Sequence, residues 1–239
     1  MAHASAQTHH QRGSDYSVQG KLLTHIMQKI CFQNIMPKVF QSLTIQSEVW
    51  GQSLCFERGQ TYLIEAESGR GKSTLCSYMV GYRDDYAGKL LFDDADARLF
   101  SIAQWTEIRQ RRVSMLFQEL RLFSELTAME NVLIKNQLTS HLSPQKIEEY
   151  FEMLGIADKK NERVALLSFG QQQRVAMIRA LAQPFDFLVA DEPVSHLDER
   201  NAQAMASLLC AEAKRQGAAV IITSIGKHMP MHYDKTIML

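Results

Sequence analysis

The chain is organised around Ala66-Glu67-Ser68-Gly69-Arg70-Gly71-Lys72-Ser73-Thr74. An apolar run with strand character, residues 61–64, precedes this stretch, and residues 75–80, which we expect to be helical, follow it. A strand, a glycine-bearing loop and a Gly-Lys-Ser/Thr helix start are the context of a phosphate-binding P-loop. The sequence therefore predicts a protein that binds the phosphates of a nucleotide.

The residue types in this loop suit phosphate chemistry. Gly69 and Gly71 let the backbone turn tightly and approach a phosphate, while the amides of the helix start attract the anion. We expect Lys72 to reach the β- and γ-phosphates and the Ser73 hydroxyl to bind Mg²⁺. The first glycine of the usual pattern is replaced by Ala66, so the loop requires this alanine to adopt the conformation of that glycine.

The composition describes one domain of the larger kind, or a core with an inserted subdomain. The chain has 239 residues, of which 46% are hydrophobic and 22% charged. Its formal net charge is zero, so no global attraction to nucleic acid is implied and no nucleic-acid partner is expected. No uninterrupted apolar run approaches the roughly 18 residues of a membrane helix, so a membrane link requires a partner.

The beginning of the chain and the cysteines carry little predicted chemistry. Residues 1–28 are rich in His, Gln, Ser and Gly, and we expect a flexible leader there. Its histidines could bind a metal, but a solvated tail is favoured; they are His3, His9 and His10. No signal peptide is visible, and the cysteines lack metal-site spacing, which favours reduced thiols in a cytosolic protein. These cysteines are Cys31, Cys55, Cys76 and Cys210.

The pattern along the rest of the chain alternates between strands and helices. Strands are expected at 29–35, 54–60, 86–93, 111–118 and 217–223, and helices at 171–182 and 200–215. Residues 119–168 have helical character, with a Ser143-Pro144 helix start and apolar residues at helical spacing from Ile147 to Leu154. We therefore expect an α/β fold with an antiparallel β portion near the N-terminus and a helical subdomain inserted at about 119–168.

A second acidic position completes the predicted site. Residues 187–190 form an apolar run that is followed by Asp191 and Glu192, as in a buried parallel strand whose carboxyl end meets a ligand. Asp191 is then the candidate for holding Mg²⁺ together with Ser73. Glu192, pointing to the other side of the strand end, could polarise the attacking water.

Further motifs resemble those of ATP-binding cassette (ABC) ATPases. Leu167-Ser168-Phe169-Gly170-Gln171-Gln172-Gln173-Arg174 is similar to the family signature, usually Leu-Ser-Gly-Gly-Gln, and lies just upstream of the Asp191-Glu192 strand. Ser195-His196-Leu197-Asp198 resembles the D-loop, Phe117-Gln118 the Q-loop, and residues 127–132 a common follow-on segment. The resemblance covers about residue 29 to the end, with the signature helix reaching about 182. The residues of these motifs favour the cassettes of lipoprotein-release and macrolide-export systems.

This resemblance implies a role for each matching residue. Two cassettes, in a homodimer or a heterodimer, would enclose two ATP molecules. The P-loop of one subunit would hold the phosphates through Ala66, Glu67, Ser68, Gly69, Arg70, Gly71, Lys72, Ser73 and Thr74. The other subunit would contact the γ-phosphate through Ser168, Gly170 and Gln171. Gln118 would contact Mg²⁺ or the water and sense the membrane partner, and Asp198 would couple the two sites.

The resemblance also places an aromatic residue against adenine. Phe40 falls at the family position, where stacking on a base is worth roughly 1 to 3 kcal/mol. A core position at a strand end is an equally weighted alternative for Phe40. Trp50 is the second candidate for stacking on the base.

Three positions depart from the family pattern. Ala66 replaces a glycine, and Phe169 puts a ring where the signature has its first glycine. Ser224 stands where the family has a histidine that contacts the γ-phosphate; serine can donate a hydrogen bond but carries no positive charge. His228 could substitute only if the loop folds back. Loss of one transition-state donor commonly costs about 10² to 10³ in rate, so slow hydrolysis is expected.

Taken together, the residues and the resemblance predict an ATPase subunit. It would dimerise around ATP and energise a separate transmembrane permease from the cytoplasmic face of the membrane, with Glu192, Lys72, Gln118 and Ser224 as the catalytic group. A regulatory cassette that binds ATP but hydrolyses it poorly is the alternative that Phe169 and Ser224 support. A cassette acting on DNA or ribosomes is disfavoured, because such proteins usually carry long insertions or two cassettes.

Overall fold

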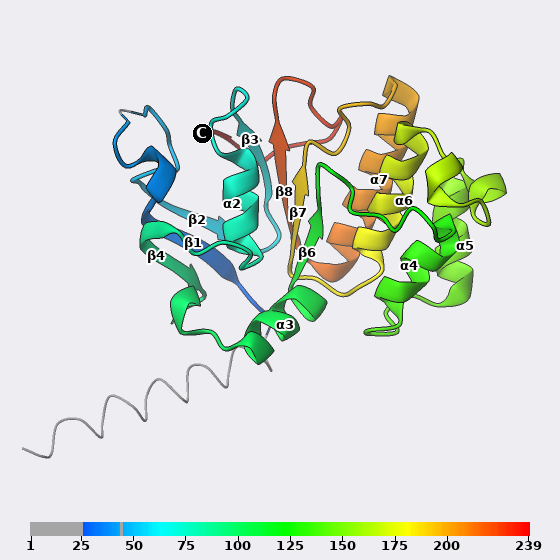
Figure 1. Ribbon diagram of the computed structural model, residues 1–239, viewed down its shortest axis with the longest axis horizontal. Helices are drawn as coiled ribbons and strands as arrows, with labels where there is room; N and C mark the ends of the chain where they lie inside the picture. Colours follow the sequence, from blue (N-terminus) through cyan, green and yellow to red (C-terminus); the bar gives the residue numbers. More distant parts are fainter. Residues whose placement is uncertain (1–25, 44) are drawn as a thin grey trace, which may run out of the picture.

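The parallel sheet forms the centre of the molecule. The computed structural model describes residues 26–43 and 45–239, and Figure 1 shows its layers. Five strands lie in the order β6-β7-β8-β3-β9, with neighbours parallel. Their bounds are β6 Val113–Leu116, β7 Phe187–Asp191, β8 Ala219–Ser224, β3 Thr61–Glu65 and β9 Lys235–Met238. Because parallel strands end at one edge, the residues after β3, β7 and β8 come together there.

The antiparallel sheet confirms the predicted β portion near the N-terminus. Its order is β2-β1-β4-β5, with β2 Ser53–Glu57, β1 Lys29–Pro37, β4 Tyr86–Phe92 and β5 Ala95–Asp96. Helix α2, Lys72–Met79, lies between the two sheets in Figure 1. Its buried face joins residues of both sheets in one hydrophobic cluster, which includes Phe32, Ile64, Leu75 and Val189.

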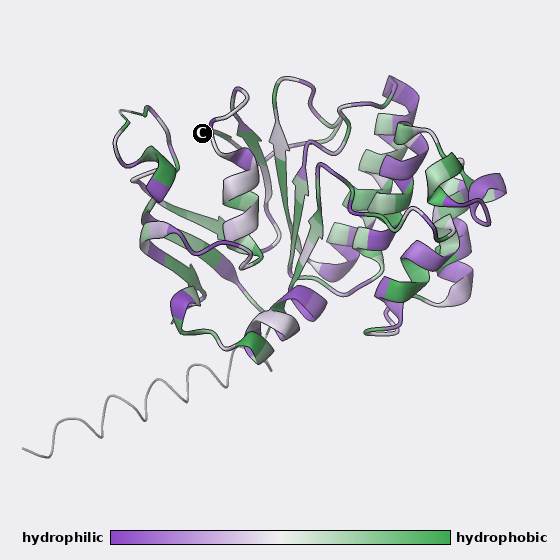
Figure 2. Ribbon diagram, viewed as in Figure 1, coloured by the Kyte–Doolittle hydropathy of each residue, from purple (hydrophilic) through white to green (hydrophobic). Residues whose placement is uncertain are grey.

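Four helices lie on the other side of the parallel sheet (Figure 1). They are α4 Ala128–Asn136, α5 Pro144–Met153, α6 Phe169–Leu181 and α7 Glu199–Gln216. Helices α6 and α7 lie next to the strands, and α4 and α5 lie beyond them. Their starts are capped by side chains, with capping boxes at Thr127 and Ser168 and a Ser143 cap before Pro144. Their apolar faces form a second cluster with β7 and β8, and Figure 2 shows the polar residues on the outer faces. No helix in the described ranges is long and apolar enough to span a membrane.

Short elements connect these layers. Helix α3, Ile102–Arg111, precedes β6 and was not predicted from the sequence. The 3-10 helices are η1 Lys38–Phe40, η2 Ala97–Leu99, η3 Ala157–Lys159 and η4 Val164–Leu166. Strand β9 was also not predicted, because its four residues are mostly exposed and lack a clear apolar pattern.

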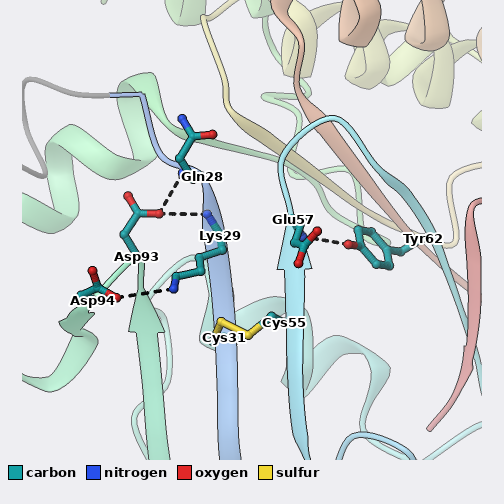
Figure 3. The surroundings of a disulfide bond; sticks show 8 residues. All are labelled: Gln28, Lys29, Cys31, Cys55, Glu57, Tyr62, Asp93 and Asp94. Atoms are coloured by element: carbon teal, nitrogen blue, oxygen red, sulfur yellow. Dashed lines mark hydrogen bonds and ion pairs between the residues drawn. A yellow bond between two sulfur atoms is a disulfide. The ribbon is translucent and has the colours of Figure 1, made fainter.

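The prediction that all four cysteines are reduced is wrong for two of them. Cys31 and Cys55 form a disulfide that links β1 to β2 (Figure 3). The antiparallel register places these residues directly opposite each other, with their Cα atoms 4.1 Å apart, which is short enough for a bridge. Cys76 and Cys210 are free, and burial raises the pKa of the Cys76 thiol well above its usual value.

The first described residues already belong to the packed structure. Met27 is buried, and its amide donates to Asp186 Oδ2 at 2.9 Å. The amides of Gln28 and Lys29 donate to Asp93 Oδ1 at 2.8 and 2.9 Å. Figure 3 shows both hydrogen bonds. Most of the predicted 1–28 leader, including His3, His9 and His10, lies outside the described residues.

Candidate functional site

The P-loop connects β3 to α2 at the carboxyl edge of the parallel sheet. Gly71 is the N-cap residue of α2 with φ of 101°, and a Cβ there would lie 2.8 Å from the Phe40 ring and 3.0 Å from Trp50. Gly69 also has a positive φ, of 80°. Both glycines are therefore required by the backbone conformation, and Gly71 also by the available space. Ala66 lies outside the left-handed region, so alanine is accommodated at this position without backbone strain.

Lys72 lies at the centre of the loop. Its side chain is buried, and its ammonium donates to the carbonyl oxygens of Ala66 and Glu67 at 3.0 Å each. The same ammonium is 3.6 Å from Glu192 Oε1. Lys72 thus brings a positive charge to the concave side of the loop, where the phosphates of a nucleotide are expected.

Ser73 and Asp191 form the candidate Mg²⁺ site. The Ser73 hydroxyl donates to Asp191 Oδ2 at 2.6 Å, and the Thr223 hydroxyl donates to the other carboxylate oxygen. Asp191 is 3% exposed, so these hydroxyls fix a nearly buried carboxylate. A hydroxyl and a carboxylate are hard oxygen ligands, and Mg²⁺ commonly binds one or two carboxylates together with waters and substrate phosphates. The residues present therefore fit this ion, although the described ranges hold no group of three or more His, Cys, Asp or Glu that could bind a metal by itself.

Glu192 follows β7 and faces the P-loop. Its φ is +50°, an uncommon conformation for a residue other than glycine, and its amide donates to the Thr223 carbonyl at 3.2 Å. One carboxylate oxygen lies 3.6 Å from the Lys72 ammonium, and the other accepts a hydrogen bond from Gln118 at 3.4 Å. The predicted catalytic residues Lys72, Gln118 and Glu192 are therefore brought together.

A cavity of about 320 Å³ lies over the P-loop and is lined by Val39, Phe40, Ser68, Gly69, Gly71, Lys72, Ser73, Thr74 and Glu192. Phe40 thus borders the expected nucleotide position, whereas Trp50 is buried and its indole donates to the Arg70 carbonyl at 3.1 Å. This arrangement favours Phe40 over Trp50 as the residue that stacks on a base. Val39, which is largely exposed beside Phe40, was missed because no motif marks it.

The side chains of two P-loop residues pair with each other. Glu67 and Arg70 form an exposed ion pair with 3.5 Å between Oε2 and a guanidinium nitrogen. Neither side chain lines the cavity. If these residues bind the nucleotide, the contact comes from their backbone. Their carbonyl oxygens already accept hydrogen bonds, that of Glu67 from Lys72 and that of Arg70 from Trp50.

The signature residues lie apart from this cavity. Ser168 caps α6, with its hydroxyl accepting from the Gln171 amide at 3.3 Å and its own amide donating to Gln171 Oε1 at 2.9 Å. Gly170 adjoins the 195–198 segment, and a Cβ added to this glycine would lie 3.2 Å from the Leu197 side chain. Asp198 caps α7, and the backbone hydrogen bond from Asn201 lowers the pKa of its carboxyl group. These residues therefore do not contribute to the nucleotide cavity of their own subunit.

The Phe169 ring is turned toward the 195–198 segment. It packs edge-on against the His196 ring, with 4.4 Å between the ring centroids. The side chain remains 42% exposed, so this aromatic pair lies at the surface beside the start of α6. The ring that replaces the signature glycine thus has a partner in its own chain.

Ser224 is directed into its own loop. It is 2% exposed; its hydroxyl donates to the Lys227 carbonyl at 3.0 Å and accepts from the Gly226 amide at 3.1 Å. His228 does not line the P-loop cavity, and its Nε2 lies 2.5 Å from Glu65 Oε1. Thr223 and Lys227 were not predicted as site residues, because both lie outside the recognised motifs.

Comparison with known proteins agrees with this geometry. A family model described as "ABC transporter" matches residues 50–195. The chain belongs to the ABC transporter family. The predicted family and fold class are therefore confirmed: this is an α/β ATP-binding cassette.

Named relatives and solved structures of this family are similar to the cassette. An uncharacterized ABC transporter ATP-binding protein of Mycobacterium tuberculosis, Rv0073, is 29% identical over 86% of this chain and 63% of its own length. The macrolide export ATP-binding/permease protein MacB of Shewanella sp. is 30% identical over 82% of this chain and 30% of its length. The cassette thus spans less than two thirds of each relative. The dimeric structure of the bacterial ABC transporter cassette MJ0796 has a TM-score of 0.71 at 26% identity, covering 82% of this chain and 87% of that one.

Proposed function

We propose that the cassette binds and hydrolyses ATP, dimerises around the nucleotide and energises transport by a separate membrane permease. The observation that carries this proposal is the convergence of Lys72, Ser73, Asp191, Glu192 and Gln118 at the P-loop cavity. A second structure of the similar MJ0796 cassette is a post-hydrolysis dimer bound to ADP and Pi, which supports hydrolysis as the reaction.

Each of these residues has a specific task in the proposed mechanism. The P-loop amides and the Lys72 ammonium bind the phosphates and offset their negative charge. Ser73 and Asp191 would hold Mg²⁺, which supplies electrostatic stabilisation of the transferred phosphoryl group. Glu192 accepts a hydrogen bond from the attacking water and orients it, and Gln118 holds the Glu192 carboxylate from the other side.

Dimerisation would complete the site with residues from the second cassette. Ser168, Gly170 and Gln171 lie at the start of α6, where free amides and the helix dipole favour a phosphate. In the proposed dimer this helix start faces the nucleotide on the partner's P-loop, and Asp198 lies between the two sites. The Phe169 ring packs on His196 of its own chain, and the post-hydrolysis state of the similar MJ0796 cassette supports hydrolysis over the regulatory alternative.

A groove beside Gln118 is the proposed contact with the permease. It has a volume of about 260 Å³ and includes the largely exposed apolar side chains of Phe123, Ile134 and Leu138. Lys135 and Arg179 also line it, and the lining residues include no acid. The groove therefore suits an apolar segment with a carboxylate. The cassette would bind this segment from the cytoplasmic face, as a peripheral subunit.

Steady-state phosphate release by the purified cassette with Mg²⁺ tests the central claim. Wild type should turn over ATP, Lys72→Ala should lose both nucleotide binding and turnover, and Glu192→Gln should bind ATP without turnover. An exposed matched variant, Glu152→Gln on α5, should behave as wild type. Failure of the wild-type cassette to bind a fluorescent ATP analogue would overturn the proposal.

A further inference from the structure

The loop that follows β8 does not present Ser224 to the nucleotide. The hydroxyl proton of Ser224 is donated to the Lys227 carbonyl within the loop, and the side chain is buried. A serine hydroxyl has one proton, so this residue has no second donor for a phosphate. The role that the family histidine plays at this position is therefore not available to Ser224 in this arrangement.

Two basic residues lie further along the same loop, and their side chains point to different places. The His228 ring contacts the Glu65 carboxylate at the end of β3, away from the P-loop cavity. The Lys227 ammonium instead donates to the carbonyl oxygen of Leu197, thirty residues earlier in the chain. Lys227 thus connects the 225–228 loop with the 195–198 segment that resembles the D-loop.

The other side of the 195–198 segment is held by α6. Phe169 packs on His196, and Gly170 leaves room for Leu197, whose side chain would lie 3.2 Å from an added Cβ. Gln173 donates to the Pro193 carbonyl at 3.3 Å and to the Ser195 hydroxyl at 3.4 Å. The segment is therefore fixed from one side by packing against the signature helix.

From the side of β8, a hydrogen bond from Lys227 holds the segment. Within residues 26–43 and 45–239, Lys227 makes the one side-chain hydrogen bond between the 225–228 loop and the 195–198 segment. A hydrogen bond from an ionised donor is stronger than one between neutral groups. Removing the ammonium leaves the Leu197 carbonyl without this donor and frees the loop to move relative to the segment.

We propose that Lys227, rather than Ser224, is the positioning residue through which the loop after β8 fixes the 195–198 segment, and with it Asp198, against the second cassette. The inference rests on the proposed ATPase function and deepens it. Lys227 acts through the Leu197 carbonyl and contacts no nucleotide in its own subunit. Its removal therefore lowers turnover in the assembled dimer and leaves nucleotide binding to the single cassette intact.

The test compares Lys227→Met and Lys227→Arg with wild type. Binding of a fluorescent ATP analogue is measured at low protein concentration, and kcat, KM and the Hill coefficient for ATP are measured under dimerising conditions. We expect Lys227→Met to lower kcat about tenfold, the effect of losing one charge-assisted hydrogen bond, with KM and analogue affinity within about twofold of wild type. Its Hill coefficient should fall toward one. Lys227→Arg should restore most of kcat, because a guanidinium can reach the same carbonyl.

Two control variants separate this role from a general effect of charge. Lys235→Met removes an exposed ammonium from β9 that makes no side-chain hydrogen bond or ion pair within the described ranges, and it should leave all parameters unchanged. His228→Ala removes the other basic side chain of the loop and should also retain kcat. Unchanged kcat in Lys227→Met, or the loss appearing in His228→Ala instead, would overturn the inference while ATP binding and wild-type turnover still stand. Absence of ATP binding in wild type would overturn the proposed function itself.

Discussion

The two sheets of the cassette are stabilised in different ways. In the parallel sheet, every residue of β7 and β8 is buried, and helices cover the face away from α2. In the antiparallel sheet, β2 buries Phe56 alone among its five residues, and a disulfide joins it to β1 (Figure 3). Packing on both faces stabilises the first sheet, whereas a covalent link reinforces the second.

This difference follows the distribution of chemistry between the sheets. Asp191 ends β7, Ser224 ends β8 and the P-loop begins after β3, so the phosphate site depends on strands with fixed, buried positions. The antiparallel sheet supplies Phe40, which follows β1 and borders the cavity. In the proposed mechanism the parallel sheet therefore carries the residues of the reaction, and the antiparallel sheet would contribute to binding of the base.

The largest effect should come from the end of β7. Asp191→Asn keeps the size of the side chain but removes the charge that Ser73 and Thr223 hydroxyls orient. We expect ATP turnover to fall about 10²-fold or more, because the proposed metal ligand is lost. Phosphate release measured against Mg²⁺ concentration checks this, with the exposed Asp158→Asn variant as control. Unchanged Mg²⁺ dependence would remove Asp191 from the metal site.

The stability of the parallel sheet should be more sensitive to truncation. Leu188→Ala in β7 removes a fully buried side chain and should lower the free energy of unfolding by about 2–5 kcal/mol. The matched variant Leu54→Ala in β2 removes a half-buried side chain and should cost about 1 kcal/mol. Urea denaturation of both variants compares the sheets directly, and equal losses would contradict the comparison.

Removal of the disulfide should affect stability and leave the chemistry unchanged. Cys31 and Cys55 are 24 residues apart, and a loop of this size corresponds to a stabilisation of about 3 kcal/mol in the chain-entropy description. Cys31→Ser with Cys55→Ser should therefore lower the free energy of unfolding by about this amount, with kcat per folded molecule retained. Denaturation of the wild type with and without reductant is the second measurement. A proportionate loss of kcat would show that the antiparallel sheet also controls the reaction.

The smallest expected effect concerns the groove beside Gln118. Burial lowers the pKa of Lys135 to about 8, with Arg179 and Arg109 contributing in the same direction. The unfolded chain then binds more protons at this residue than the folded chain between about pH 8 and 10.4, so stability rises with pH in that interval. The unfolding free energy of the wild type minus that of Lys135→Met should therefore increase from pH 8 to 10. A decrease would exclude a half-buried ammonium at this position.

The sequence predicted most of the parallel sheet and the P-loop side of the site. Apolar runs that end in Asp191 or in the P-loop indicate buried strands whose carboxyl ends lie at one edge of the sheet. This is why Lys72, Ser73 and Glu192 could be placed together. The pairing of Cys31 with Cys55 depends on strand register, which spacing alone does not give. The orientation of Ser224 depends on a loop whose hydrogen bonds are made within four residues, and Lys227 has no motif to mark it. Helix α3 and β9 were missed because short, partly exposed elements carry a weak periodic signal.

The contact between Met27 and Asp186 joins parts of the chain that are 159 residues apart. During synthesis, the N-terminal end of β1 cannot reach its final anchor until β7 has left the ribosome. The same holds for β3, whose neighbours β8 and β9 come from the last part of the chain. Because these partners are made late, β3 and β6 stay without their neighbouring strands for much of translation, whereas β1, β2 and β4 can pair among themselves earlier. Production of this cassette is thus expected to depend on chaperones that shield β3 and β6 until the sheet can close.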